Sequence, residues 1–119
     1  MRPVTDEDAV LARCAAVLDD RDVLTDPDVL PTYSRDRSTG SPVGEPFAAV
    51  FPRSTEQVAA VMAAAHDHRV PVVPRGAGSG LAGGSNAVDG CLVVSLERMR
   101  DVLVVDEQDG YVETQPGVL

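Results

Sequence analysis

The sequence of 119 residues contains no lysine and no tryptophan, and aromatic residues of any kind make up only 3% of it. Without lysine, the chain cannot form a phosphate-binding loop of the Walker type or a lysine Schiff base. With so few aromatics, the core must be built mainly from the aliphatic side chains among the 44% of residues that are hydrophobic. The length predicts one domain at most.

Basic residues are also scarce: ten arginines face nineteen Asp and Glu, which gives a formal net charge of −9. Nucleic-acid binding draws most of its affinity from phosphates neutralised by Lys and Arg, so this charge argues against a nucleic-acid partner. It equally disfavours an anionic membrane surface. No apolar run approaches the ~20 residues of a membrane span. The acidic start, MRPVTDEDAV, lacks the apolar core of a signal peptide.

Only two cysteines are present, Cys14 and Cys91, and each lies in an apolar stretch. We expect two buried free thiols, which suit a reducing cytoplasm, with a disulfide between them as the alternative. His66 and His68 lie two residues apart in a predicted helix, where side chains point to different faces. We therefore expect a solvated pair and assign no metal site.

Two helices are predicted, over residues 5–18 and 54–68. Each begins with a capping-box pattern, in which Thr or Ser is followed three residues later by Asp or Gln. The apolar residues expected on one face of each helix are Val10, Cys14, Val17 and Leu18 in the first, and Val58, Val61, Met62 and Ala65 in the second. Residues 19–47 are rich in Asp, Pro, Ser and Gly, which predicts irregular structure. Within them, SRDRSTGSPVGEP at 34–46 is predicted to be a surface loop with solvated charges.

Short apolar runs predict strands at residues 48–51, 70–73, 91–96, 102–106 and 111–115, with one helical turn at 97–100. The order strand, helix, strand over 48–73 indicates a βαβ unit with parallel strands. The polar EQDG between the last two strands predicts a hairpin. The fold class is therefore α+β, a small βαβ unit followed by further strands. The sequence stops at PGVL as a new segment begins, so we expect an incomplete domain.

Residues 74–85, PRGAGSGLAGGS, place five glycines directly after a predicted buried strand. Glycine permits positive φ and close approach of a ligand, and successive backbone N–H groups in such a turn form an anion-binding concavity. Arg75 is the only charged residue between Val70 and Val88, so this stretch is locally positive in an acidic chain. We predict a phosphate site here, with a flexible surface loop as the alternative.

Gly78, Gly80 and Gly83 also spell the G-x-G-x-x-G of an NAD-binding Rossmann module. A Rossmann loop leads directly into a helix whose N-terminus faces the pyrophosphate. The residues that follow here, GGSNAVDG, form helices poorly. The Rossmann alternative therefore requires a helix that starts near Gly80.

With these motifs, the sequence resembles FAD-linked oxidases of the vanillyl-alcohol oxidase/p-cresol methylhydroxylase type, in the branch of glycolate oxidase and D-lactate dehydrogenase. The resemblance spans residues 33–118. It rests on YSRD near the start, on FAAVFPRSTEQVAAVM before the loop, on the loop itself, and on GCLVVSLERMRDVLVVDEQDGYVETQPGV after it.

The resemblance implies the N-terminal part of a two-subdomain FAD-binding domain. Residues 1–46 would form an N-terminal helix and irregular segment, and residues 47–119 a partial FAD-binding domain truncated at its C-terminus. The loop would wrap the FAD pyrophosphate mainly through backbone N–H groups. The implied cofactor contacts are Pro74, Arg75, Gly76, Ala77, Gly78, Ser79, Gly80, Leu81, Gly84 and Ser85. Ser79 aligns with a His that binds flavin covalently in some relatives, which implies non-covalent FAD here.

The parent protein would be an FAD-dependent oxidoreductase that converts a 2-hydroxy acid, such as glycolate or D-lactate, to the 2-oxo acid. The family's substrate-oxidising residues belong to a cap domain beyond this sequence, so no catalytic residue is assigned. The expected partners are the missing C-terminal part of the FAD domain and the cap domain, or an iron–sulfur electron-transfer protein. In a second hypothesis, the chain is a catalytically inert truncated fragment.

Overall fold

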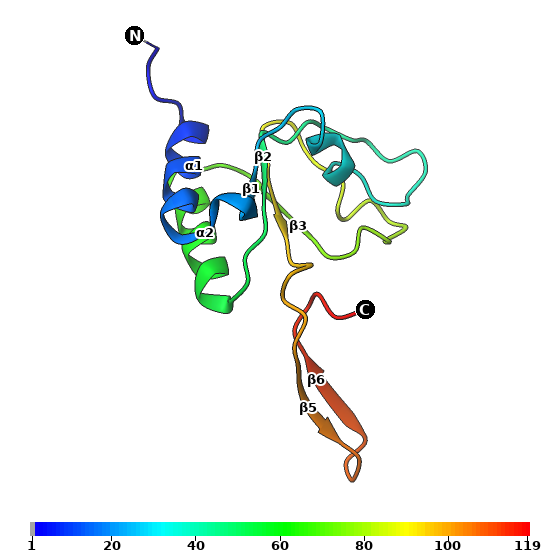
Figure 1. Cartoon of the computed structure of the whole chain (residues 1–119). Helices are drawn as coiled ribbons and strands as arrows, with labels where there is room; N and C mark the ends of the chain where they lie inside the picture. The colour runs from blue at the N-terminus through cyan, green and yellow to red at the C-terminus, as the bar shows by residue number, and fades with distance from the viewer. Residues whose placement is uncertain (1) are drawn as a thin grey trace.

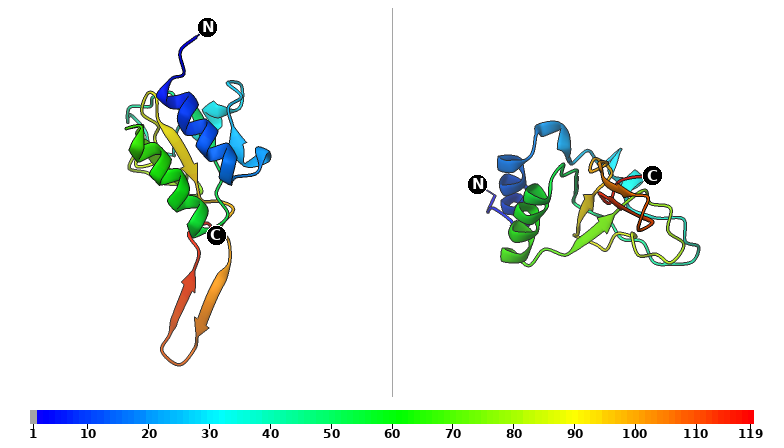
Figure 2. Two further views of the ribbon diagram at one scale, coloured as in Figure 1. Left: turned by 90° about the vertical axis from the view of Figure 1, so that its left-hand side faces the viewer. Right: turned by 90° about the horizontal axis from the view of Figure 1, so that it is seen from below.

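The computed structural model describes residues 2–119, which form a body of helices and a four-stranded sheet, and a two-stranded ribbon that projects from it (Figure 1). The helices and strands are α1 (Asp6–Val17), β1 (Val23–Leu24), β2 (Ala48–Val50), α2 (Thr55–Asp67), β3 (Val72–Arg75), β4 (Leu92–Ser95), β5 (Val102–Asp106) and β6 (Tyr111–Thr114). Both helices lie side by side on one face of the sheet (Figure 2). Within residues 2–119, no helix is long and apolar enough to cross a membrane.

The predicted capping box of α1 is confirmed, because Asp8 N donates to Thr5 Oγ1 at 3.1 Å and Thr5 N donates to Asp8 Oδ2 at 3.2 Å. The buried face of this helix and its end comprises Val10, Cys14 and Leu18. Val17 was also expected on this face, but it is 41% exposed.

The start of α2 departs from its predicted capping box in one hydrogen bond. Ser54 Oγ accepts from Gln57 N, as expected, but Gln57 Oε1 accepts from Arg53 N at 2.8 Å and not from Ser54 N. Gln57 Nε2 also donates to Val17 O at 3.2 Å, which satisfies a free carbonyl at the end of α1. One glutamine therefore joins the start of one helix to the end of the other.

Further contacts hold the two helices together. Arg13 pairs with Asp67 at 2.7 Å, and His68 Nδ1 lies 3.1 Å from Asp6 Oδ1. On the apolar face of α2, Val61 and Ala65 are buried as predicted, whereas Met62 is 44% exposed.

The sheet has the order β1-β2-β4-β3, with β2 and β3 each parallel to β4 and β1 antiparallel to β2. The predicted βαβ unit with parallel strands is confirmed, and β4 fills the position between its two strands. Most of residues 19–47 are irregular, as expected. They also contain two 3₁₀ turns, Asp20–Asp22 and Leu30–Tyr33, as well as β1.

Strand β3 begins two residues later than predicted because α2 ends in a Schellman motif. Arg69 adopts a left-handed φ of 54°, and its N–H donates to His66 O at 3.1 Å. The N–H of Val70 then donates to Ala65 O at 2.9 Å. Val70 therefore belongs to the helix end, and the strand starts at Val72.

Two apolar clusters lie on the two faces of the sheet. One joins the helices to Val50, Leu92 and Val94, and the other contains Phe51 and Val93. The two cysteines are free and buried, as predicted, and each belongs to a different cluster. Burial raises the pKa of both thiols.

A buried carboxylate connects three parts of the body. Asp22, which is 1% exposed, accepts from Arg53 Nε at 2.7 Å and Arg53 Nη2 at 3.1 Å, and also pairs with Arg98. Burial alone would raise the pKa of Asp22, but the Arg53 hydrogen bond and the Arg98 charge outweigh it and hold that pKa below its ordinary value. The carboxylate therefore ties the 3₁₀ turn before β1 to the start of α2 and to the turn after β4.

Strands β5 and β6 form the predicted hairpin, an antiparallel ribbon with an irregularity between Val102 and Val104. The helical turn predicted at residues 97–100 is wrong. Met99 N donates to Leu96 O at 3.0 Å, so the chain makes a single reverse turn there. This turn brings the chain from β4 to the ribbon.

Candidate functional site

The glycine-rich loop leaves the carboxyl end of β3, the edge strand of the sheet, and returns to begin β4. Residues 76–91 contain bends and turns but no helix. The Rossmann alternative, which requires a helix starting near Gly80, is therefore wrong. Pro74 and Arg75 are the last residues of β3, where proline is tolerated because the strand lies at the edge.

The loop presents backbone that side chains do not cover. Gly78 has a φ of +68° and Gly83 a φ of +81°, which L-residues rarely adopt. A Cβ atom placed on Gly76 or on Gly84 would meet no atom within 4 Å. An anionic group can therefore approach the chain closely at both positions, as a diphosphate bound by backbone N–H groups requires.

The side chain of Arg75 is bound beneath the loop. Its Nη1 donates to Arg35 O at 2.7 Å, its Nη2 donates to Thr32 O at 3.4 Å, and its guanidinium lies 5.8 Å from the centre of the Tyr33 ring. A Cβ on Gly78 would collide with this guanidinium. Arg75 therefore fastens residues 32–35 to the start of the loop.

Asn86 joins the loop to the segment that precedes β2. It is 8% exposed, its Oδ1 accepts from Asp36 N at 2.8 Å, and its Nδ2 donates to Ser38 Oγ at 3.3 Å and Pro42 O at 3.2 Å. Sequence reasoning missed this residue. The available signal was that Asn86 is the only amide side chain within residues 76–87, which are otherwise small or apolar.

Asp36 was expected to be a solvated loop charge, but it is 7% exposed and lies against the loop. Hydrogen bonds from the Ser38 side chain and backbone hold the pKa of Asp36 below its ordinary value, although burial opposes them. Its Oδ2 has no hydrogen-bond partner within residues 2–119, and a Cβ on Gly80 would lie 3.4 Å from it. A negative charge therefore stands behind Gly80.

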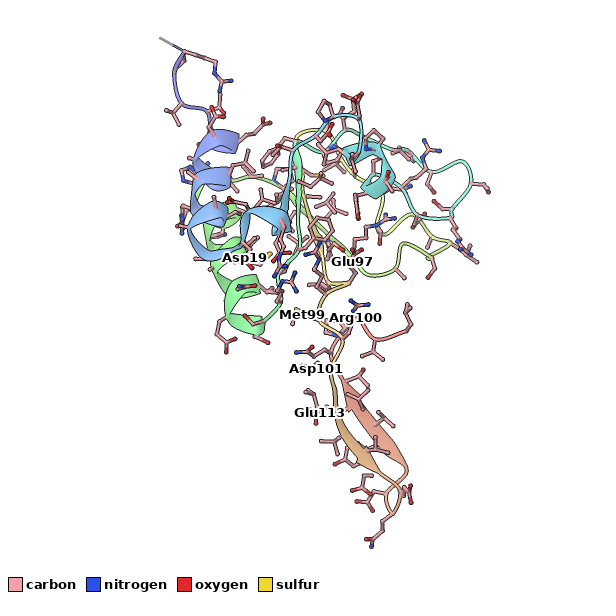
Figure 3. All side chains as sticks on the ribbon, viewed as in Figure 1. Asp19, Glu97, Met99, Arg100, Asp101 and Glu113 are labelled. Carbon is pink, nitrogen blue, oxygen red and sulfur yellow. The ribbon has the colours of Figure 1, made fainter. Side chains whose placement is uncertain are left out.

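A cleft of about 240 Å³ opens where the loop begins. It is lined by Gly76, Ala77, Glu97, Arg100 and residues 116–119. Figure 3 labels Glu97 and Arg100 at the junction between the body and the ribbon. Gly117 closes this junction tightly. Its N–H donates to Met99 O at 2.8 Å, and a Cβ there would collide with the backbone at Leu96.

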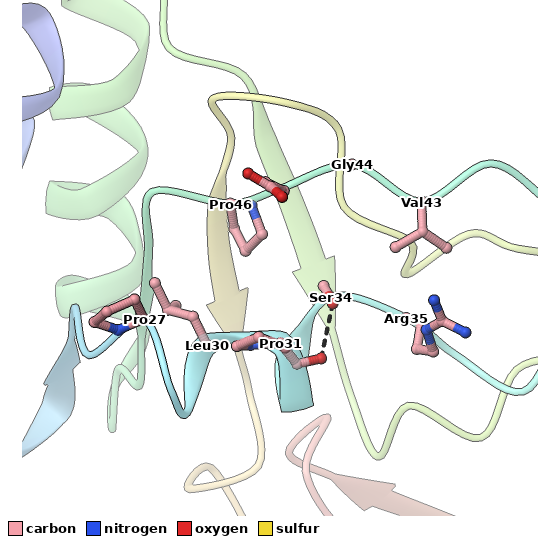
Figure 4. Close-up of a pocket in the computed structure, with 9 residues that line it drawn as sticks. Pro27, Leu30, Pro31, Ser34, Arg35, Val43, Gly44 and Pro46 are labelled. Atoms are coloured by element: carbon pink, nitrogen blue, oxygen red, sulfur yellow. Dashed lines mark hydrogen bonds between the residues drawn. The ribbon is translucent and has the colours of Figure 1, made fainter.

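A larger cavity of about 430 Å³ lies between the second 3₁₀ turn and the segment before β2 (Figure 4). Its lining includes Leu30, Pro31, Arg35, Val43 and Pro46, and no residue of the glycine-rich loop contributes to it. The smaller cleft is therefore the candidate site, because it alone of the two is lined by Gly76.

Comparison with known proteins identifies the family. Residues 46–119 match the family model described as FAD binding domain. The chain belongs to this family of FAD-binding domains. It is 36% identical over 107 residues to an uncharacterized FAD-linked oxidoreductase of Mycobacterium tuberculosis, covering 90% of this chain and 23% of the relative. It is 41% identical over 97 residues to a D-2-hydroxyglutarate dehydrogenase of Stutzerimonas stutzeri, covering 82% and 21%.

Solved structures show the same fold. A p-cresol methylhydroxylase with substrate bound superposes with a TM-score of 0.81 at 24% identity, covering 95% of this FAD-binding chain and 22% of the other. A 4-ethylphenol oxidase from Gulosibacter chungangensis gives a TM-score of 0.83 at 24% identity. The predicted fold class and the prediction of FAD are confirmed. The chain spans about a fifth of the length of the relatives it matches.

Proposed function

We propose that this chain supplies the diphosphate-binding part of the FAD site in an oxidoreductase that converts a 2-hydroxy acid to a 2-oxo acid. The observation that carries the proposal is the loop after β3, whose backbone is open at Gly76 and Gly84 and which leads into no helix. The substrate class is supported by the relatives named D-2-hydroxyglutarate dehydrogenase, glycolate oxidase subunit and D-lactate dehydrogenase.

In this proposal, backbone N–H groups of residues 76–80 hold the diphosphate, flanked by Pro74, Leu81, Gly84 and Ser85. Hydrogen bonds to a charged group contribute about 1.5–3 kcal/mol each. The side chain of Arg75 keeps its bonds to residues 32–35 and contributes through its backbone. FAD supplies the redox chemistry, and this chain positions it; no residue here is assigned a catalytic role.

We further propose that residues 47–119 act as part of a larger FAD domain, completed by a cap domain that binds the substrate or served by an iron–sulfur protein that accepts electrons. The chain spans only 23% and 21% of the length of two relatives, which supports a larger protein with further domains. We also propose a cytoplasmic location, which the two free, buried thiols support.

The substitution Gly76→Ala tests the proposed function. The added methyl group contacts nothing in the chain, so folding should be as stable as in the wild type by urea denaturation. The same methyl group would occupy the space of the diphosphate, so FAD affinity, measured by quenching of flavin fluorescence, should fall about tenfold or more. Equal affinity in the two proteins would contradict the proposed site. A wild-type chain that binds no FAD would favour the inert fragment.

A further inference from the structure

The cleft beside the loop, lined by Gly76, Ala77, Glu97, Arg100 and residues 116–119, contains one basic side chain among the residues that the structure shows lining it. We propose that this side chain, Arg100, binds the diphosphate of FAD as a charged anchor beside the backbone donors of residues 76–80. The inference rests on the proposed function, because it names a further ligand contact within the same site.

The neighbouring arginines are already engaged. Arg75 donates to two backbone carbonyls of residues 32–35. Arg98 pairs with Asp22 and lies 5.0 Å from the centre of the Phe51 ring. Arg100 is exposed, and it takes part in none of the ion pairs recorded for residues 2–119. Its guanidinium is therefore available to an anion in the cleft.

The backbone on both sides of Arg100 is held in place. Gly117 N donates to Met99 O at 2.8 Å, Gln115 N donates to Asp101 O at 2.9 Å, and Asp101 N donates to Gln115 Oε1 at 2.9 Å. These bonds fix the Cα of Arg100 relative to the turn after β4. A fixed attachment point lowers the entropy that the side chain loses when it binds a ligand.

The charges around the loop favour binding of the diphosphate near Gly76, where the loop begins. The carboxylate of Asp36 stands behind Gly80, so the charge of a diphosphate held by residues 76–80 meets less repulsion toward Gly76 than toward Gly80. The side chain of Glu97 also lines the cleft, where its Oε2 accepts from Ser95 Oγ at 3.2 Å. A diphosphate at Gly76 therefore needs a cation to offset Glu97, and Arg100 is the side chain placed to supply it.

The test compares Arg100→Gln with the wild-type 119-residue chain for three ligands: FAD, ADP and adenosine. FAD and ADP contain the diphosphate, and adenosine does not. We expect Arg100→Gln to weaken FAD and ADP about tenfold, to leave adenosine unchanged, and to lower the salt dependence of FAD binding. Arg100→Lys should retain part of the lost affinity, because it keeps the charge.

Arg35→Gln is the matched control, because it removes the same charge from an exposed side chain that lines the other cavity. It should bind all three ligands as the wild type does, and urea denaturation should show equal stability for all variants. Unchanged FAD and ADP affinity in Arg100→Gln overturns the inference and leaves the proposed function standing, as does an equal loss of adenosine affinity. A wild-type chain that binds no FAD overturns the proposed function and this inference with it.

Discussion

At the scale of single residues, Gly117 occupies a position where the chain leaves no room for a side chain. A Cβ there would lie 2.7 Å from Met99 O and would collide with Leu96 O, and both atoms belong to the backbone. Gly117→Ala should therefore lower the free energy of unfolding by about 1–3 kcal/mol, as overpacking does. The matched control is Gly84→Ala, whose Cβ meets nothing within 4 Å. Equal urea midpoints for the two variants would contradict the close contact.

Within residues 2–119, Asp22 is the most deeply buried charged side chain. It is 1% exposed and pairs with two arginines. Asp22→Asn keeps its volume and leaves both guanidinium groups without their anion, so the free energy of unfolding should fall by about 3 kcal/mol. This value is at the low end for a buried pair, because Arg53 is 40% exposed.

The same substitution has a pH signature. The pKa of Asp22 is lower in the folded chain than its ordinary value of 3.8. Its stabilising contribution is therefore complete above the ordinary pKa and is lost as the pH falls through the folded-state pKa. The stability difference between wild type and Asp22→Asn should be constant near neutral pH and shrink in acid. A difference that does not shrink in acid would show that Asp22 acts through packing alone.

Ser79 underlies the prediction that FAD is held non-covalently. A serine hydroxyl cannot form a histidyl link to flavin, which the family resemblance implies at this position in some relatives. The flavin should therefore appear in the supernatant when the FAD-loaded chain is precipitated with acid. Flavin fluorescence in the washed precipitate would contradict this prediction.

At the scale of elements, local patterns predicted both helices and the sequence of the main strands along the chain. Capping residues and apolar spacing were enough, because these signals act within a few residues of one another. The start of β3 was misplaced because Arg69 adopts a left-handed φ, a conformation that glycine signals and arginine does not. The central place of β4 was also beyond prediction, because strand order depends on contacts distant in sequence.

Asn86 joins the glycine-rich loop to residues 36–42. Asn86→Ala removes three hydrogen bonds and leaves the N–H of Asp36 unpaired where burial keeps water away. The free energy of unfolding should fall by about 1–3 kcal/mol, the cost of an unsatisfied buried group. FAD affinity should fall too, because the loop loses its attachment to residues 36–42.

Ser85→Ala is the control for Asn86→Ala, because Ser85 is the neighbouring residue and its side chain makes no hydrogen bond within residues 2–119. We expect it to leave stability within about 0.5 kcal/mol of the wild type. If both variants are as stable as the wild type, the hydrogen bonds of Asn86 do not join the loops.

At the scale of the whole molecule, the sequence located the glycine-rich loop but not what surrounds it. The loop was visible because five glycines lie close together after an apolar run. Asp36 and Asn86 lie 50 residues apart and meet only in the folded chain. Arg100 and Gly117 enter the site because the turn after β4 brings them beside Gly76. No local pattern contains these contacts.

The ribbon presents an apolar face that no part of the described chain covers. Val105 of β5 pairs with Val112 of β6. Val102 of β5 pairs with Thr114, which lies two residues after Val112 in β6. The three valines therefore share one face, and they are 54%, 63% and 58% exposed at Val102, Val105 and Val112. An apolar face of this kind, next to unpaired strand edges, favours association between chains.

We expect the 119-residue chain to self-associate through this face, with a sedimentation coefficient that rises with protein concentration. Val105→Lys places a charge at the centre of the apolar face, so it should shift the chain toward the monomer. Val104→Lys is the matched control, because Val104 pairs with Glu113 on the opposite face, where a new cation meets a carboxylate. A wild-type chain that sediments as a monomer at every concentration, or equal effects of the two lysines, would contradict this assignment.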